Sequence, residues 1–343
     1  MSTDLNETIK TFSKVTSYEK EQGKEEAYNL YEMSIKYDYD IQNVINSFSE
    51  ALKGDVDIDA EIEKAINKEV FGKDNQVNIN FQSFGCTAFR YKDEVKNVVR
   101  MGRNYDFAIN TSALRVFCDP KPVSDRKRYK SIAFAALSNI DANEAEKKKR
   151  ETLVAPFICL DGVNEKGVSI AVLVVDSRPT TQYEDRKSIF TTLAIRLVLD
   201  CAATTSEAVD LLGKYNMFAS GLKDYHFFIN DANGDSKVVE YNYLKHRTRD
   251  MVVSDVDIVT NFYIFDGEKK GHGFERRNDV RDILKKSTLE ANQKMWEALK
   301  VSAQNEKPND PTSNTQWSIV YNNTYFAAEV AIRRNWNDKY RLC

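Results

Sequence analysis

Apolar runs separated by short polar stretches occupy most of the chain. The runs at 153–160 and 168–175 are continuous and flank the polar stretch 161–167, a pattern typical of strands buried on both faces. The polar stretch 92–94 predicts the turn of a hairpin, and 111–150 is mostly loop-like. Runs rich in β-branched and aromatic residues predict strands at 87–91, 95–101, 131–137, 225–230, 237–241, 257–262, 317–321 and 325–332.

Helical patterns lie between these strands. Thr191 and Ser206 are suitable N-caps for two of the helices. The order of strands, then helices, then strands favours an α+β fold, in which two antiparallel sheets pack face to face under helices on both outer faces. The predicted helices are 191–202, 206–215, 275–285 and 289–299.

Residues 1–85 differ in pattern and in charge. Apolar positions from Ala27 to Tyr37 and from Ile41 to Leu52 include spacings of three and four that suit an amphipathic helix, and a second short helix is expected at 60–70. The segment carries 17 Asp and Glu against 9 Lys and Arg, whereas the rest of the chain is mildly basic. We interpret it as a helical prosegment ending near Gly72; the alternative is a helical N-terminal domain that stays attached.

Composition excludes several functional classes. With 42% hydrophobic and 29% charged residues, the 343-residue chain is typical of a soluble globular protein. No apolar run approaches the roughly 20 residues needed to span a bilayer, so stable membrane insertion is not expected. No signal peptide is visible, which predicts a cytoplasmic protein, or a secreted one if a leader was removed. The charged run 143–151 mixes both signs without aromatic residues, which does not predict nucleic-acid binding.

The cysteines show no spacing typical of a disulfide framework or a zinc site, and no cofactor or metal is expected. A thiol-based redox protein would also need a resolving cysteine at a persuasive spacing, which is missing. The five cysteines are Cys86, Cys118, Cys159, Cys201 and Cys343.

Cys86 opens the first predicted hairpin. Antiparallel pairing of its strands would bring Cys86 beside Arg103 and Asp106. A reactive cysteine is a thiolate, which a cation stabilises, and a carboxylate can orient an amine or a proton. Cys86 is therefore a candidate nucleophile. The alternative is a small buried hydrophobe, with Arg103 and Asp106 in a surface ion pair of little consequence.

Two motifs, Cys86-Thr87-Ala88 and Gly102-Arg103-Asn104-Tyr105-Asp106, resemble those of the choloylglycine hydrolase family of N-terminal-nucleophile (Ntn) amidases. That family includes bile salt hydrolases and penicillin V acylases, with acid ceramidase and N-acylethanolamine amidase as more distant relatives. The likeness continues in order through 161–169, His226–Asp231, Val238–Tyr241, Val259–Asn261, Glu275–Arg276 and Gln316–Tyr321.

The resemblance implies an αββα Ntn-hydrolase sandwich and activation by self-cleavage between Gly85 and Cys86. Glycine leaves its carbonyl open to attack because it has no Cβ. Cleavage would remove the prosegment 1–85 from a catalytic domain at 86–343. It would also free the α-amine of Cys86. An α-amine has a reference pKa of about 8 and can act as a base at neutral pH, whereas an amide nitrogen cannot.

The resemblance also implies roles for four further residues. Arg103 would stabilise the thiolate or the tetrahedral anion, Asp106 would hold the α-amine, and Asn261 would donate to the oxyanion. Arg276 matches a late arginine of the family, although the neighbouring Arg277 leaves its register open. Asn104 is a weaker candidate beside the substrate.

One position departs from the family. Bile salt hydrolases place an asparagine shortly after the turn at 161–167, where this chain has Val174. A side-chain donor to the oxyanion would then be missing, and losing one donor costs about a hundredfold or more in other hydrolases. A non-catalytic relative that binds a ligand is therefore an alternative.

The implied substrate is a small-molecule N-acyl amide with an apolar acyl chain, hydrolysed through an acyl-enzyme on Cys86. The long segment before Cys86 looks more like acid ceramidase and N-acylethanolamine amidase than like bile salt hydrolases. Transfer of the acyl group to an amine, as in the related penicillin acyltransferases, is a further alternative. Relatives often assemble, so a homo-oligomer stays open.

Overall fold

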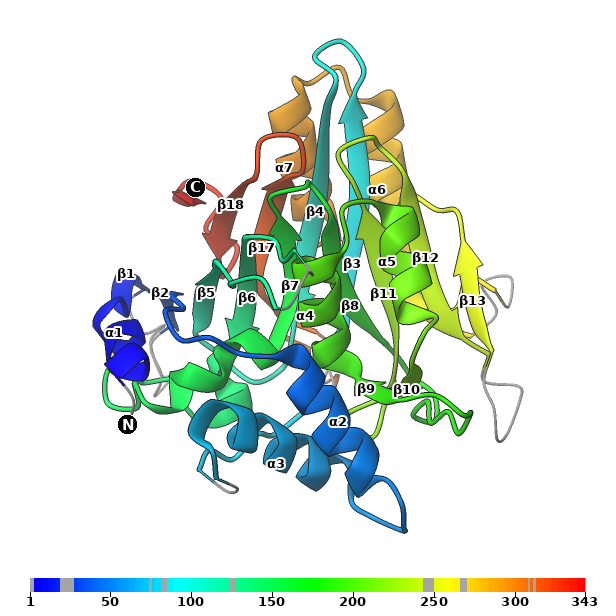
Figure 1. Ribbon diagram of the computed structural model, residues 1–343. Helices are drawn as coiled ribbons and strands as arrows, with labels where there is room; N and C mark the ends of the chain where they lie inside the picture. Colours follow the sequence, from blue (N-terminus) through cyan, green and yellow to red (C-terminus); the bar gives the residue numbers. More distant parts are fainter. Residues whose placement is uncertain are drawn as a thin grey trace.

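Two β-sheets packed face to face form the centre of the molecule (Figure 1). Ala27 and Cys343 lie outside the described part of the chain. The computed structural model describes residues 3–18, 28–73, 76–81, 85–123, 127–242, 250–265, 270–307, 309–310 and 313–342.

The larger sheet has nine described strands. Each pair of neighbouring strands runs antiparallel, except β2 and β5, which run parallel. Its strands, in spatial order, are β1 (Ser13–Tyr18), β2 (Tyr28–Ser34), β5 (Ala113–Cys118), β6 (Ser131–Ala136), β7 (Cys159–Asn164), β8 (Ser169–Val175), β11 (Asp224–Asn230), β12 (Ser236–Tyr241) and β13 (Met251–Ser254).

The smaller sheet has six antiparallel strands. In spatial order they are β14 (Ile258–Val259), β3 (Gly85–Asp93), β4 (Val98–Asp106), β17 (Thr315–Asn322), β18 (Ala327–Ile332) and β19 (Lys339–Leu342). Two short pairs lie apart from both sheets: β9 (Ser188–Phe190) with β10 (Asn216–Phe218), and β15 (Asn261–Phe262) with β16 (Gly271–His272).

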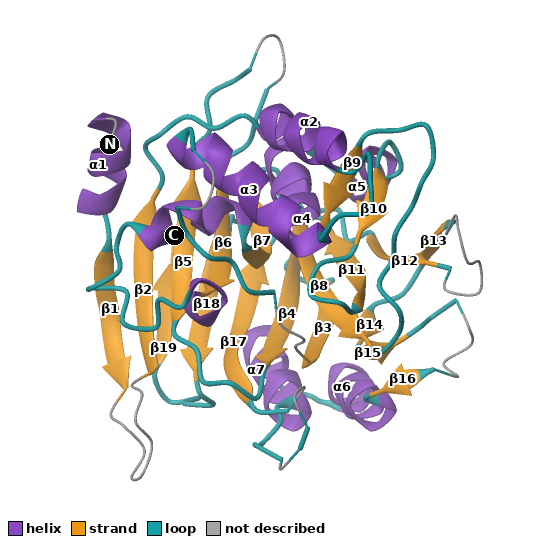
Figure 2. Ribbon diagram, turned by 90° about the horizontal axis from the view of Figure 1, so that it is seen from below, coloured by secondary structure: helices purple, strands orange, loops and turns teal. Residues whose placement is uncertain are grey.

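Helices cover both outer faces, as the order of elements predicts (Figure 2). Helices α2 (Ile41–Ala51), α3 (Ile58–Phe71), α4 (Thr191–Cys201) and α5 (Thr205–Leu212) lie on the side of the larger sheet. Helices α6 (Phe274–Lys286) and α7 (Ala291–Ser302) lie against the smaller sheet. The short α1 (Thr3–Lys10) lies beside β2. The molecule is thus a four-layer αββα sandwich.

Aromatic side chains fill the space between the sheets. The Tyr105 ring of β4 stacks on the Trp317 ring of β17 at 4.3 Å between centroids. Phe134 of β6 meets Tyr321 of β17 edge to face at 6.3 Å, and this contact joins the two sheets. All four side chains are fully buried. Burial of large apolar groups therefore holds the layers together.

The N-terminal segment is not all helical, which corrects the sequence prediction. The helices expected at 41–52 and 60–70 are confirmed as α2 and α3, and α3 ends at Gly72 in the left-handed conformation. However, Tyr28–Ser34 forms strand β2, because its apolar positions from Tyr31 onward alternate with a period of two. Strand β2 pairs with β5, so the segment extends the larger sheet.

Other predicted elements shift or change type. Strand β5 lies in the stretch taken as loop, and the run 153–160 forms a 3₁₀ helix over Glu151–Phe157 before β7 begins. Pro156 explains that change, because it lacks the N–H that a central strand needs. The hairpin turn lies at 94–97, and the strand predicted at 257–262 breaks at Thr260.

Smaller corrections concern the starts of two helices and two elements that were not predicted. Thr204, not Ser206, caps α5 by accepting the Glu207 N–H at 3.1 Å, and the residue before α4 is Phe190, which gives no side-chain cap. A 3₁₀ helix at Leu137–Ile140 and the edge strand β19 also lie outside the predictions.

The N-terminal segment packs into the core of the body. Phe48 of α2 is fully buried and meets the rings of Phe190 and Phe218 edge to face at 5.3 and 5.9 Å. At the start of α3, the Asp59 carboxylate accepts the Gly221 N–H at 3.0 Å. Helices α2 and α3 therefore share one apolar core with the body.

Phe48→Ala should lower the free energy of unfolding of the whole chain by about 3–5 kcal/mol, the usual cost of removing a buried phenylalanine. Denaturant unfolding followed by circular dichroism should show one transition at a lower midpoint. Val95→Ala is the control, because Val95 is 96% exposed and its loss should change little. A separate, weak transition of the N-terminal segment, with the main midpoint unchanged, would contradict the shared core.

Candidate active site

The register of the β3–β4 hairpin fixes the positions of the predicted site residues. Gly85 pairs with Asp106, and Ala88 pairs with Arg103. Side chains alternate along a strand, so Cys86 and Arg103 share one face of the smaller sheet while Asp106 lies on the other. The first face is turned to the larger sheet and the second to α6 and α7, as the partners of these side chains confirm.

Arg103 is fully buried between the sheets and pairs with Asp161 of β7. Its Nε donates to Asp161 Oδ2 at 2.5 Å, and the Tyr321 hydroxyl donates to the other carboxylate oxygen. Among the described residues, the two terminal nitrogens of Arg103 have no hydrogen-bond partner. The guanidinium interacts electrostatically with Cys86, which lies on the same face.

The Cys86 thiol is neutral in this arrangement. Its side chain is fully buried, and burial raises the pKa of the thiol to about 12. The positive charge of Arg103 opposes this rise, and the negative charge of Asp106 adds to it. A thiol with this pKa is almost entirely protonated at pH 7, so a base must remove its proton before it can attack.

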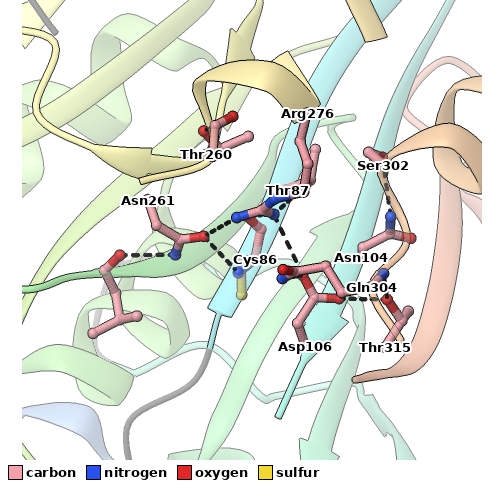
Figure 3. A network of polar contacts seen from close by, with 12 residues as sticks. Cys86, Thr87, Asn104, Asp106, Thr260, Asn261, Arg276, Ser302, Gln304 and Thr315 are labelled. Carbon is pink, nitrogen blue, oxygen red and sulfur yellow. Dashed lines mark hydrogen bonds and ion pairs between the residues drawn. The ribbon is translucent and has the colours of Figure 1, made fainter. Parts of the chain in front are cut away.

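The Asn261 side chain contacts the backbone of the nucleophile (Figure 3). Its Oδ1 accepts the Cys86 N–H at 3.1 Å, and its Nδ2 donates to the Val174 carbonyl at 2.8 Å. Val174 is therefore adjacent to the site, but it contributes its carbonyl oxygen and not its side chain. Asn261 follows the break at Thr260, which turns the chain from β14 into β15.

Arg276 connects the other site residues, as Figure 3 shows. Its Nη1 donates to the Cys86 carbonyl at 3.0 Å and to Thr87 Oγ1 at 2.8 Å, and lies 3.4 Å from Asp106 Oδ2. Its Nη2 donates to Asn261 Oδ1 at 2.8 Å. Arg277 instead lies over the Phe262 ring, at 5.4 Å. The geometry therefore assigns the contact with Cys86 to Arg276.

A glycine makes room for Arg276 at the start of α6. Gly273, the N-cap, has φ +91°, and a Cβ there would lie 2.7 Å from Arg276 Nη2 and 2.8 Å from Thr260 Oγ1. Both the backbone angle and the space favour glycine.

Asp106 is held by residues that sequence analysis missed. Gln304 Nε2 donates to its Oδ2 at 2.7 Å, and Thr315 Oγ1 donates to its Oδ1 at 2.6 Å. Burial raises the pKa of Asp106, while Arg276 and these two donors lower it. Gln304 and Thr315 are far from Cys86 in sequence, and no motif marks them.

Asn104 lies away from Cys86. Its Nδ2 donates to the Leu299 carbonyl and to Ser302 Oγ of α7, at 2.9 and 3.1 Å, and its Oδ1 accepts from Ser318 Oγ at 2.6 Å. These contacts hold α7 on the smaller sheet. Across the described ranges, no cluster of His, Cys, Asp and Glu side chains could hold a metal ion.

A cavity of about 830 Å³ lies beside the site. It is bounded by residues 271–276, 303–305, 307 and 310, including Arg276 and Gln304 but not Cys86. Solvent therefore reaches Arg276 and Gln304, two of the side chains that contact Asp106, while the thiol stays enclosed.

Comparison with known proteins identifies similar sequences and folds. A model of the family described as linear amide C-N hydrolases, choloylglycine hydrolase family, matches residues 86–261. No curated protein sequence matches the chain. Penicillin V acylase from Agrobacterium tumefaciens has a similar fold, with a TM-score of 0.53 and 20% identity over 72% of this chain and 83% of that one. Two variants of conjugated bile acid hydrolase from Clostridium perfringens give TM-scores of 0.55 and 0.54, at 15% identity over 75% of this chain and 92% of theirs.

Arg103→Met should destabilise the protein by about 3–5 kcal/mol at pH 8, because Asp161 would remain buried without its partner. Burial raises the pKa of Asp161 and Arg103 lowers it, so removal of Arg103 raises that pKa further. The folded variant then keeps a proton on Asp161 up to a higher pH than the unmodified protein does, and the loss of stability should decrease as the pH falls from 8 to 5. Denaturant unfolding at both pH values measures the difference.

Arg90→Met is the matched control for this experiment. Arg90 lies on β3 and pairs with Asp257, whose side chain is more than half exposed, so the cost should stay below about 1 kcal/mol at both pH values. An equal cost of Arg103→Met at pH 8 and pH 5 would contradict the role of the buried pair.

Proposed function

The chain belongs to the choloylglycine hydrolase family of linear amide C-N hydrolases, and we propose that Cys86 is its nucleophile after self-cleavage of the Gly85–Cys86 bond. The protein is a hydrolase of linear amide C–N bonds with an Ntn-type fold. The proposed substrate is a small-molecule N-acyl amide.

The contacts of the Cys86 backbone support this role most directly. Its N–H donates to Asn261, and its carbonyl accepts from Arg276. Asn261 thus contacts the atom that would become the α-amine, and Arg276 holds Asn261 there through its Oδ1. A structural cysteine in a strand would need no such contacts beyond the ladder of the sheet.

Self-cleavage would begin with attack of the Cys86 sulfur on the Gly85 carbonyl carbon. The C–N bond breaks, the nitrogen takes up the thiol proton and becomes the α-amine, and Gly85 is held as a thioester. Water then hydrolyses the thioester, which restores the thiol and leaves a carboxylate on Gly85. The positive charge of Arg103 favours the thiolate in this step by opposing the effect of burial.

In the mature enzyme the α-amine would act as the base. It accepts the thiol proton during attack on the substrate carbonyl and passes the proton to the leaving amine, so that an acyl-enzyme forms on Cys86. Asn261 Oδ1 lies 3.1 Å from this nitrogen and would orient the amine. The second Nδ2 hydrogen of Asn261 would donate to the oxyanion, and water would then release the acid.

Asp106 contributes negative charge to the site, and among the described contacts the hydrogen bonds of its carboxylate reach Cys86 through Arg276. We propose that it keeps Arg276 in place and stabilises the protonated α-amine. Arg276 in turn balances the buried carboxylate and lowers the pKa of Asp106.

The surroundings of Cys86 favour an apolar acyl group. Tyr105, its partner across the ladder, stacks on Trp317 and lies 6.1 Å from the Phe107 ring. These rings are buried, and if substrate entry opens the space beside Cys86 they would pack against a hydrocarbon chain or ring. Hydrolysis of an N-acyl amide with an apolar acyl chain is therefore our proposal for the substrate class.

Residues 1–85 would remain bound after cleavage, because β2, α2 and α3 are built into the fold. Helix α3 is held to the body by Asp59, which accepts the Gly221 N–H and interacts electrostatically with Tyr225.

The intact mass of the purified protein tests self-cleavage. The unmodified protein should separate into chains of residues 1–85 and 86–343 under denaturing conditions, and the two pieces should elute together under native conditions. Cys86→Ala should stay whole. Cys118→Ala, which changes another fully buried cysteine, should be cleaved normally. An unmodified protein that stays whole and hydrolyses no N-acyl amide would indicate the non-catalytic alternative.

Arg276→Ala should lower the rates of self-cleavage and of amide hydrolysis by about a hundredfold or more, because the contact with the Cys86 carbonyl and the charge beside Asp106 are lost. Arg277→Ala is the matched control, since that side chain lies over Phe262. Its rates should stay within about threefold of the unmodified protein. Equal effects of the two substitutions would exclude a specific role for Arg276.

A further inference from the structure

His226 and Glu240 form a buried pair that the proposed mechanism does not use. They lie on neighbouring strands, β11 and β12, and neither side chain is exposed. His226 Nδ1 lies 3.0 Å from Glu240 Oε1. Buried ionisable groups are costly, so a pair of this kind needs partners for all its polar atoms.

The partners fix the proton positions. His226 Nε2 lies 2.8 Å from the Thr260 carbonyl oxygen, which can only accept, so Nε2 carries a proton and donates. The contact of Nδ1 with Glu240 then requires one proton between the two atoms. The Glu240 carboxylate also accepts the N–H groups of Ile264 and Phe265, at 2.9 and 3.0 Å.

All three backbone contacts fall on the segment that carries Asn261. The Thr260 carbonyl belongs to the peptide bond that joins Thr260 to Asn261, and Figure 3 shows the two residues side by side. The contacts of Glu240 hold the same segment three and four residues further on. The pair therefore fixes the chain on both sides of Asn261.

Other side-chain contacts hold residues next to Asn261 in the same segment. Thr260 Oγ1 donates to the Gly273 carbonyl at 3.0 Å, and the Tyr263 hydroxyl donates to Asp224. Neither of these contacts holds the peptide bond before Asn261. Rotation of that peptide would move the Asn261 side chain away from the Cys86 nitrogen, and misplacement by about 1 Å can cost a hundredfold in rate.

We propose that His226 and Glu240 are positioning residues that hold Asn261 against Cys86, through the Thr260 carbonyl and the N–H groups of Ile264 and Phe265. The proposal rests on the proposed function, in which Asn261 orients the α-amine and donates to the oxyanion. Substitution of either residue is therefore expected to lower the turnover rate more than it lowers the stability of the fold.

The test compares His226→Gln and Glu240→Gln with Val239→Ala. Gln keeps much of the volume of each side chain but cannot make every contact: at 226 its amide oxygen would face either the Glu240 carboxylate or the Thr260 carbonyl, and at 240 its amide nitrogen would face a backbone N–H. Val239 is fully buried beside Glu240 on β12 and touches none of the segment's polar contacts, so its substitution measures loss of packing alone. Both Gln variants should lose about tenfold to a hundredfold in kcat with KM changed less than about threefold, while Val239→Ala keeps its kcat.

A double-mutant cycle separates positioning from general damage. In an Asn261→Ala background, His226→Gln should cost little further, because the side chain that it positions is gone. Losses that multiply, or a kcat for both Gln variants equal to that of Val239→Ala, would overturn the proposal.

A second measurement is independent of activity. In protein labelled with ¹⁵N-asparagine, the Asn261 side-chain amide signal is assigned from its absence in Asn261→Ala. That signal should shift in both Gln variants and stay in place in Val239→Ala. An unmoved signal overturns the positioning role, whereas an inactive unmodified protein with a shifted signal in the variants contradicts only the proposed function.

Discussion

The ion pair between Arg103 and Asp161 connects the two sheets directly beside Cys86. Each partner lies in a different sheet, and both are fully buried, so neither charge is tolerable without the other. Because Arg103 shares a face with Cys86, the contact that aligns the sheets also brings a positive charge to the thiol. Fold and site thus depend on the same side chain, and a shift of β4 against β7 would disturb both.

In the uncleaved chain, positive and negative side chains lie close together around Cys86. Arg276 contacts the Cys86 carbonyl, Asn261 and Asp106 from the helix layer, while Arg103 approaches from the sheet interface. Strand β3 therefore has a cation on each of its faces, Arg103 from β4 on one and Arg276 from α6 on the other. Each cation pairs with a buried carboxylate, Arg103 with Asp161 and Arg276 with Asp106, and the positive charge of Arg103 also favours negative charge on the Cys86 sulfur. Burial alone has the opposite effect, as the raised pKa of Cys86 shows.

The sequence could predict the sandwich, the hairpin and the meeting of Cys86 with Arg103, because strand alternation and a short turn set them locally. It could not predict Gln304 or Thr315, which reach Asp106 only through tertiary packing. The apolar pattern from Ala27 onward fits both a helix and a strand, because spacings of three and four occur in it together with the alternation that forms β2. Pairing with β5, more than eighty residues away, decides that strand.

The pairing of β2 with β5 bears on the proposed activation by self-cleavage. A prosegment that only covered a site could leave after cleavage, but β2 supplies a strand to the larger sheet and α2 contributes Phe48 to its core. Its loss would expose the edge of β5 and a large apolar surface, which favours a cleaved protein of two associated chains. Cleavage would then change the chemistry at Cys86 more than the fold: an amide nitrogen that cannot accept a proton becomes an amine that can, at the position where Asn261 already holds it.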